Sequence, residues 1–337
     1  MCKKIVSVLF VLSISIYIIL EVSTSLEAHN ILRQHWFPEQ HDTFLASLHS
    51  NDSTPPDEAS SSPLLEDETQ KRLPDCLIIG FSKCGTTALR GFLTLHPDIV
   101  SPLREIRYFT SHYEENLEWY KNQMPLSTAA QITVEKSAGY ISTSESLERI
   151  RQMNASVKLV VMVRDPITRL QSEYARSVSK NSPRAPSFRT WCGGTAQSPS
   201  VLRLVDYATP LEQVFSLFPR QQVLVLSEEL LEEKPLDILK EVYGFLGLKN
   251  TFEKTDLVFN EEKGFFCFNT SSPKYPKAKG SIVLNEKTGC LGSHKGRAHP
   301  EIGDRFFKEL VDFIRPHNQR LFSLIGRKFN WPNFKGV

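Results

Sequence analysis

The sequence has almost no excess of charge of either sign, because 40 Lys and Arg residues stand against 38 Asp and Glu residues and leave a formal net charge of +2. This balance excludes a protein that binds nucleic acid through bulk positive charge, so we expect any anionic ligand to meet a local basic patch. The sequence also lacks an internal repeat, and its 6 cysteines show no spacing typical of a metal site. We therefore expect a folded domain that needs no metal.

Long apolar runs are also missing, apart from one near the N-terminus. The segment Ile5–Leu20 carries no charge and follows Lys3 and Lys4. Its length lies between that of a membrane-spanning helix and that of a signal-peptide core. We interpret residues 5–25 as a signal-anchor with residues 1–4 in the cytosol, and a cleaved signal peptide is the alternative. In both cases the remainder enters the secretory lumen.

The polar segment that follows predicts a tether and then a folded domain. Residues 26–72 are rich in Ser, Pro, Asp and Glu, especially between 51 and 63, and are expected to form a flexible luminal stem. Residues 73–337 form the expected catalytic domain. Cys267 and Cys290 bracket a compact loop and could be bridged. Glycosylation sequons, which agree with a luminal location, stand at Asn51, Asn154 and Asn269.

Strand-like apolar runs alternate with helical patterns along this domain. The expected strands are 76–79, 131–134, 157–163 and 222–226. The expected helices are 87–95, 144–153, 167–178 and 235–246. This alternation predicts an α/β fold, a single domain with a central parallel sheet flanked by helices.

The first strand leads into a loop that is typical of anion sites. Gly80 and Gly85 allow the backbone to bend, and Thr86 or Thr87 can cap the helix that follows. Backbone N–H groups and the positive end of the helix dipole then point toward one small space. The lysine stands at position 83, earlier than in nucleotide-triphosphatase loops, and no acidic partner for magnesium is apparent. An ordinary strand–turn–helix is the alternative interpretation.

The third strand ends in a second candidate for phosphate binding. Arg164 follows that strand, and ligands of open α/β sheets bind beyond the carboxyl ends of strands. Together with the Ser172 hydroxyl, Arg164 could hold a second phosphate. The alternative is that Arg164 pairs with Asp165 or with solvent.

Two further groups combine charges in a way that suits transfer chemistry. Glu105 lies between Arg104 and Arg107, so it is either a general base or one partner of a surface ion pair. Lys136 leaves the end of the second strand. A flexible basic loop that suits phosphate or sulfate, or is simply solvated, comprises Lys295, Gly296, Arg297, Ala298 and His299.

The order of these motifs resembles that of the heparan sulfate sulfotransferases. The resemblance runs from about Pro74 to Pro332 and is weakest between Asn181 and Thr209. The C-terminal segment 326–331 is most similar to the glucosamine 3-O-sulfotransferase branch. The matching segments are Ile-Ile-Gly-x-x-Lys-x-Gly-Thr, Arg-Glu-Ile-x-x-Phe, Val-Glu-Lys-Ser, Val-Arg-Asp-Pro-x-x-Arg-x-x-Ser-x-Tyr and Cys-Leu-Gly-x-x-Lys-Gly-Arg.

The resemblance implies a sulfotransferase fold, the donor 3′-phosphoadenosine 5′-phosphosulfate, a heparan sulfate acceptor and a Golgi membrane location. Arg164 and Ser172 would hold the 3′-phosphate, and the loop 295–299 would close over the donor. Cys267 and Cys290 match the family's disulfide. The 5′-phosphosulfate would be cradled by Ser82, Lys83, Cys84, Gly85, Thr86 and Thr87.

The same resemblance assigns the reaction. Glu105 matches the catalytic base, Lys83 would stabilise the leaving oxygen, and Lys136 would position donor and acceptor. Arg104 and Arg107 would join Glu105 and Lys136 in binding the acceptor. The scheme requires no metal.

The sequence departs from the 3-O-sulfotransferase pattern on the acceptor side. Ser82 and Thr87 replace two arginines of the loop, and Arg107 and Thr110 replace a histidine and an aspartate that touch the acceptor sugar in the family. These departures leave two alternatives open. One is a sulfotransferase for another position or glycan, such as N-sulfation or chondroitin. The other is a catalytically weak glycan-binding relative.

Overall fold

The computed structural model describes residues 68–178, 185–292 and 297–335, all within one compact unit. The expected cytosolic tail, the signal-anchor and nearly all of the stem lie outside the described residues, as does Asn51. Among the described helices, none is both long enough and apolar enough to cross a bilayer.

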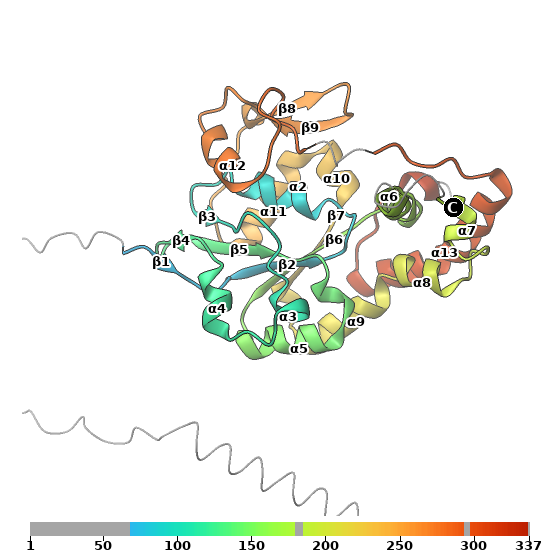
Figure 1. Ribbon diagram of the computed structural model, residues 1–337, viewed down its shortest axis with the longest axis horizontal. Coiled ribbons are helices and arrows are strands. Elements are labelled where there is room, and N and C mark those ends of the chain that lie inside the picture. The colour runs from blue at the N-terminus through green and yellow to red at the C-terminus, as the bar shows by residue number, and fades with distance from the viewer. Residues whose placement is uncertain (1–67, 179–184, 293–296, 336–337) are drawn as a thin grey trace, which may run out of the picture. The chain divides into compact units, whose positions relative to one another are not determined.

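A parallel sheet of 5 strands forms the centre of the fold, in the order β3–β5–β2–β6–β7 (Figure 1). Its central strand β2 is buried along its whole length, which explains why its sequence is a continuous apolar run. The prediction of a parallel α/β sheet is confirmed. The strands are β3 (Ile99–Val100), β5 (Ile132–Lys136), β2 (Cys76–Gly80), β6 (Lys158–Val163) and β7 (Val223–Ser227).

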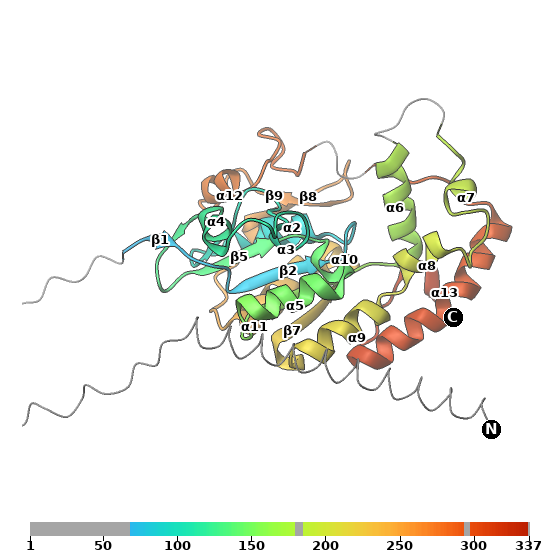
Figure 2. The same ribbon diagram turned by 60° about the horizontal axis from the view of Figure 1, so that its bottom comes forward.

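Helices cover both faces of this sheet. In Figure 1, α2 (Thr86–Leu93) and α11 (Pro235–Leu246) lie on one face, and α5 (Ser144–Met153) and α9 (Ala208–Leu217) lie on the other. Figure 2 brings this second face forward and shows α5 and α9 side by side. The predicted helices 144–153 and 235–246 have the observed bounds, and the other predicted elements differ by one or two residues at their ends.

A short pairing shows that the fold begins earlier than position 73. Strand β1 (Gln70–Lys71) pairs antiparallel with β4 (Leu126–Ser127). Residues 70 and 71 were expected to belong to the stem. They are therefore part of the folded domain.

A second, helical region has an apolar core of its own. It combines α6 (Pro166–Val178), α7 (Phe188–Trp191), α8 (Pro199–Val205) and the long helix α13 (Asp304–Ile325), which lie together at the right of Figure 1. Of these helices, only α6 was predicted from the sequence. Residues 188–205, which belong to the segment with the weakest family resemblance, are thus a folded part of this helical region.

A hairpin of β8 (Leu257–Asn260) and β9 (Phe265–Phe268) lies beside α2, followed by α12 (Tyr275–Ser281). The structure joins Cys267 to Cys290 in a disulfide. Gly91 of α2 allows the hairpin and the residue after α12 to approach closely, because a Cβ there would lie 3.2 Å from Phe268 Cζ of β9 and 2.9 Å from Ile282 Cδ1. The remaining helices are α3 (Tyr108–Ser111), α4 (Leu117–Asn122) and α10 (Glu228–Glu233).

Candidate functional site

The loop between β2 and α2 has the backbone shape that its glycines predicted. Lys83 and Gly85 both have left-handed backbone angles, with φ of 64° and 71°. Gly85 is the N-cap of α2 and offers no side chain as a cap, so the prediction that Thr86 or Thr87 caps this helix is wrong. The reason is that Thr86 already lies inside the first turn. The start of α2 is thereby left facing a cavity that Lys83 and Gly85 line.

The side chains of Ser82 and Cys84 do not line this cavity. The Ser82 hydroxyl donates to Glu173 Oε1 at 2.6 Å, toward α6. Cys84 is fully buried, and burial raises the pKa of its thiol to about 12. Their contribution to an anion site is therefore limited to the backbone.

The cavity in front of the loop gathers predicted residues that are far apart in the sequence. Its charged and polar lining includes Lys83, Arg164, Ser172, Arg297 and His299. The apolar part of the lining includes Phe265, Phe266, Leu231 and Leu291. Ala298 is exposed, and Lys295 and Gly296 lie outside the described residues. Cations and aromatic rings that line one cavity suit a phosphorylated nucleoside.

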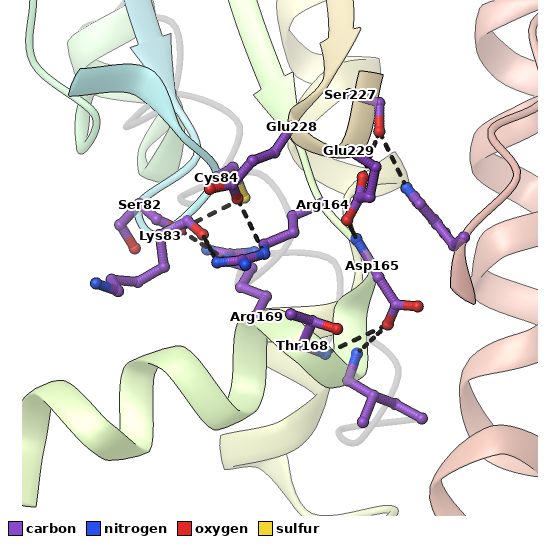
Figure 3. Close-up of polar contacts among 12 residues, drawn as sticks. Ser82, Lys83, Cys84, Arg164, Asp165, Thr168, Arg169, Ser227, Glu228 and Glu229 are labelled. Atoms are coloured by element: carbon purple, nitrogen blue, oxygen red, sulfur yellow. Dashed lines mark hydrogen bonds and ion pairs between the residues drawn. The ribbon is translucent and has the colours of Figure 1, made fainter. Parts of the chain in front are cut away.

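Glu228 is the cavity residue that the sequence interpretation missed. Arg164 Nε lies 3.0 Å from Glu228 Oε2, and Arg164 Nη1 donates to the Lys83 carbonyl at 3.3 Å. Figure 3 shows Arg164 and Glu228 meeting beside the loop, whereas the side chain of Lys83 extends away from them. The suggested pairing of Arg164 with Asp165 is wrong. The Asp165 carboxylate instead accepts the N–H of Ile167 at 3.0 Å and so caps α6.

The protonation of Glu228 is set by its surroundings. Burial raises its pKa to about 8, Arg164 opposes this, and the nearby carboxylates of Glu232 and Glu229 add to it. Glu228 directly follows β7 at the carboxyl edge of the sheet. The rule that singled out Arg164 after β6 therefore applied to Glu228 as well.

The proposed base Glu105 lies at the other side of the loop. Lys136, the last residue of β5, places Nζ 2.7 Å from Glu105 Oε1 and 3.3 Å from Thr87 Oγ1. Arg107 Nη2 lies 3.0 Å from Glu105 Oε2, so the alternative of an ion pair with a neighbouring arginine is also realised. Arg104 is exposed. Lys136 thus links the anion loop to Glu105.

Charge keeps Glu105 ionised although it is partly buried. Burial alone would raise the pKa of Glu105, but Lys136 and Arg107 outweigh this effect and lower it below the usual value. Burial lowers the pKa of Lys136, while Glu105 opposes that change. A carboxylate that stays charged at neutral pH can accept a proton.

A second cavity lies on the α6 side of the loop and was not predicted. Among its lining residues are Phe81 and Ser82 of the loop, Glu173 of α6, and Trp191 and Arg203 from the helical region. The remaining basic residues that line it are Arg169 and Arg176. Its signal in the sequence is weak, because segment 181–209 has the faintest family resemblance.

Two other predicted features have a place in the described structure. Asn154 is exposed, whereas Asn269 is half-buried and its side-chain nitrogen donates to the Thr255 carbonyl at 2.8 Å. Asn154 is therefore the more accessible of these two sequons. Within the described ranges, no group of three or more His, Cys, Asp or Glu side chains is placed to hold a metal ion.

Comparisons with known proteins match this chain to one family. A family model described as a sulfotransferase domain matches residues 73–298. Mouse heparan sulfate glucosamine 3-O-sulfotransferase 3A1 is 40% identical over 274 residues, which cover 80% of this chain and 67% of that protein. Human heparan sulfate glucosamine 3-O-sulfotransferase 6 is 37% identical over 273 residues, which cover 80% of this chain and 77% of that protein. The chain spans about two thirds of the length of the first of these relatives.

Solved structures support the fold. The crystal structure of a sulfotransferase from Alicyclobacillus acidocaldarius superposes with a TM-score of 0.57 at 20% identity, and the match covers 77% of this chain and 98% of that one. At this identity the likeness concerns the fold alone.

Proposed function

Because the chain belongs to the sulfotransferase family, with the heparan sulfate glucosamine 3-O-sulfotransferases as relatives, we propose that it transfers a sulfuryl group from 3′-phosphoadenosine 5′-phosphosulfate to the 3-hydroxyl of glucosamine in heparan sulfate. One observation carries the proposal. The Lys136 ammonium lies 3.3 Å from Thr87 Oγ1 of the anion loop and 2.7 Å from Glu105 Oε1. The loop, the Lys136 ammonium and the Glu105 carboxylate therefore lie close enough to act on one reacting group.

The donor would lie in the cavity in front of the loop. The N-terminus of α2 and Lys83 would bind the 5′-phosphosulfate, and Arg164 with Ser172 would bind the 3′-phosphate. Phe265 and Phe266 offer aromatic faces to the adenine ring of the donor. Arg297 adds a further cation to the lining.

The reaction would be an in-line displacement at sulfur. Glu105 accepts the proton of the acceptor hydroxyl while the new O–S bond forms. The S–O bond to the 5′-phosphate breaks, and its electron pair leaves with the phosphate oxygen. Lys83 stabilises the charge that grows there, and Lys136 holds Glu105 beside the loop. The products are the sulfated sugar and 3′-phosphoadenosine 5′-phosphate.

The acceptor would approach from the side of Glu105 and of the second cavity. A polyanionic chain needs local cations, since the protein has a net charge of only +2. Arg107 beside Glu105, and Arg176 and Arg203 in the second cavity, supply such cations. Arg104, exposed next to Glu105, adds another.

A second candidate is sulfuryl transfer to another position or to another glycan. The observation that favours it lies in the loop, where the Ser82 hydroxyl bonds Glu173 and Thr87 Oγ1 accepts a bond from Lys136. Neither side chain adds positive charge toward the acceptor. An acceptor with a different sulfation pattern would suit such a loop.

We further propose a luminal location in the Golgi, with the N-terminal segment as membrane anchor. The disulfide between Cys267 and Cys290 supports an oxidising compartment. Glycosidase treatment of the expressed protein tests this placement, because a luminal chain that carries glycans becomes smaller on treatment.

The test of the activity uses the full chain with radiolabelled donor and purified heparan, chondroitin and dermatan chains. The labelled product is then digested to disaccharides to locate the new sulfate. Label at the glucosamine 3-position is the expected result. Label on another position or chain would favour the second candidate, and donor binding without label on any chain would favour a glycan-binding relative.

A further inference from the structure

The loop that carries Glu105 is held through its backbone by the end of β5. The Arg107 N–H donates to Ser137 Oγ at 3.0 Å, and the Ile106 N–H makes a longer bond of 3.4 Å to Glu135 Oε1. The Ser137 hydroxyl donates to the same Glu135 oxygen at 2.6 Å. The two N–H groups that follow Glu105 therefore both depend on Glu135, one directly and one through Ser137.

The bond from Ser137 to Glu135 gives the hydroxyl a fixed role. A hydroxyl has one proton to donate, and here that proton is committed to a carboxylate. The remaining lone pairs of Ser137 Oγ then accept the Arg107 N–H, and a chain of hydrogen bonds of this kind strengthens each member. Removing the Glu135 carboxylate would free the hydroxyl to rotate away from Arg107.

Glu135 itself is fully buried. Tyr120 donates its hydroxyl to Glu135 Oε2 at 3.3 Å, so both carboxylate oxygens accept hydrogen bonds. Burial raises the pKa of Glu135, and the bonds from Ser137 and from the Ile106 N–H oppose that change. A buried carboxylate is costly unless it is bonded in this way, and the loop backbone supplies part of what it needs.

The end of β5 contacts the loop that carries Glu105 from both faces of the sheet. Successive side chains of a strand point to opposite faces, so Glu135 and Lys136 diverge. Lys136 bonds the side chain of Glu105, while Glu135 and Ser137 bond the backbone that follows it. Arg107 also has a left-handed backbone with φ of 56°, which a non-glycine residue keeps only when its surroundings hold it there.

We propose that Glu135, acting through Ser137, is the positioning residue that sets the place of the Glu105 carboxylate relative to Lys136. The proposal rests on the proposed function of Glu105 as base, and it names the group that fixes that base. Glu135 does not line the donor cavity, so its loss should affect turnover and leave donor binding intact.

The test compares three variants of the full chain. Glu135→Leu removes both acceptors at similar volume, and Glu135→Gln keeps an acceptor oxygen. Thr133→Val is the matched control, because Thr133 is fully buried on the same strand and face and its hydroxyl has no hydrogen-bond partner among the described residues. The measurements are turnover, the Kd for 3′-phosphoadenosine 5′-phosphate, and amide hydrogen exchange in residues 104–111.

The Leu variant should lose ~10²-fold in turnover, as expected when a reacting group is displaced by about 1 Å. Its Kd for 3′-phosphoadenosine 5′-phosphate should stay within twofold of the wild-type value, and amide hydrogen exchange at residues 106 and 107 should accelerate. The Gln variant should recover most of the activity, and the Thr133→Val protein should behave as wild type. Unchanged exchange at 106 and 107 in the Leu variant, or an equal loss of donor affinity and turnover, would overturn the proposal.

A milder variant keeps the proposal testable if the Leu protein does not fold. Ser137→Ala removes the acceptor of the Arg107 N–H together with the bond that the hydroxyl donates to Glu135, and it should lower turnover by ~10-fold with faster exchange at position 107. Wild-type exchange there would contradict the proposal. If the wild-type chain transfers no sulfuryl group, the proposed function fails, and the exchange measurement still decides whether Glu135 holds the loop.

Discussion

Two carboxyl–cation pairs border the same loop, and their surroundings shift the pKa of the two carboxyl groups in opposite directions. Glu105 meets Lys136 at 2.7 Å and Arg107 at 3.0 Å, and its pKa is lowered although burial opposes this. Glu228 meets Arg164 at 3.0 Å, but burial raises its pKa to about 8. The difference shows that an ion pair alone does not fix the charge of a carboxylate. The number of neighbouring cations and the depth of burial decide it.

This comparison divides the site into two halves. On the acceptor side, a charged carboxylate is available to accept a proton. On the side where we propose that the donor binds, burial raises the pKa of Glu228 to about 8, beside the cations that we propose bind its phosphates. Glu105→Gln should therefore lower turnover, whereas Glu228→Gln should keep the donor affinity at its low-pH value.

The largest effect is expected for Glu105→Gln. Turnover should fall by ~10²-fold or more, because the amide cannot accept the proton of the acceptor hydroxyl. The Kd for 3′-phosphoadenosine 5′-phosphate, measured by calorimetry, should remain nearly unchanged. Glu118→Gln is the matched control, since Glu118 also pairs with a lysine at 2.7 Å but is exposed. Wild-type turnover in the Glu105 variant would remove that residue from the mechanism.

Lys83→Ala should lower both donor affinity and turnover. Lys83 lines the cavity in front of the loop, and in the proposed mechanism it stabilises the charge that grows on the leaving oxygen, so donor affinity and turnover should each fall by ~10-fold. Titration calorimetry and single-turnover kinetics separate the two losses. The control is Lys279→Ala, which removes an exposed lysine that pairs with Glu286. If neither quantity changes, the loop is not the phosphosulfate site.

Glu228→Gln should have a smaller effect that depends on pH. The Glu228 proton is lost as pH rises through about 8, and the resulting charge repels the donor phosphates. The wild-type Kd for 3′-phosphoadenosine 5′-phosphate should therefore rise by up to ~10-fold between pH 7 and 9, as the protonated fraction falls. The Gln variant should keep the low-pH affinity throughout. Parallel pH profiles for the two proteins would show that Glu228 does not face the phosphates.

The sequence predicted several residues that line the cavity in front of the loop, but it did not predict which side chains they contact. Cys76–Gly80 and Lys158–Val163 are short apolar runs of a buried sheet, so the residues that follow them were recognisable as edge residues. Glu228 was missed because its meeting with Arg164 depends on β6 and β7 being neighbours in the sheet, which no local pattern states. The error about Asp165 has a local origin instead, since its role as a cap depends on α6 beginning at Pro166, one residue earlier than expected.

Backbone contacts were beyond the reach of sequence patterns. Glu135 belongs to a recognised motif, yet its bonds go to the backbone at 106 and 107, where side-chain identity carries no signal. The helical region was also unpredicted, apart from α6, because α7 and α8 are short and α13 contains Pro316. A proline in a helical pattern argues for an earlier end.

The smallest effect is expected for Arg107→Ala, and it tests whether the number of cations sets the charge of Glu105. The Arg107 side chain is 63% exposed, so solvent screens its pairing with Glu105, and turnover should change by only ~2- to 5-fold. Arg107 lowers the pKa of Glu105, so its removal should shift the acid limb of the pH profile of kcat/KM to higher pH. Arg104→Ala is the matched control, because it removes an exposed charge from the same loop. It should leave the acid limb of the kcat/KM profile at the same pH. The shift should also shrink at high salt. A limb that stays fixed would mean that Lys136 alone keeps Glu105 charged, and a limb that moves to lower pH would mean that Arg107 does not stabilise the Glu105 carboxylate.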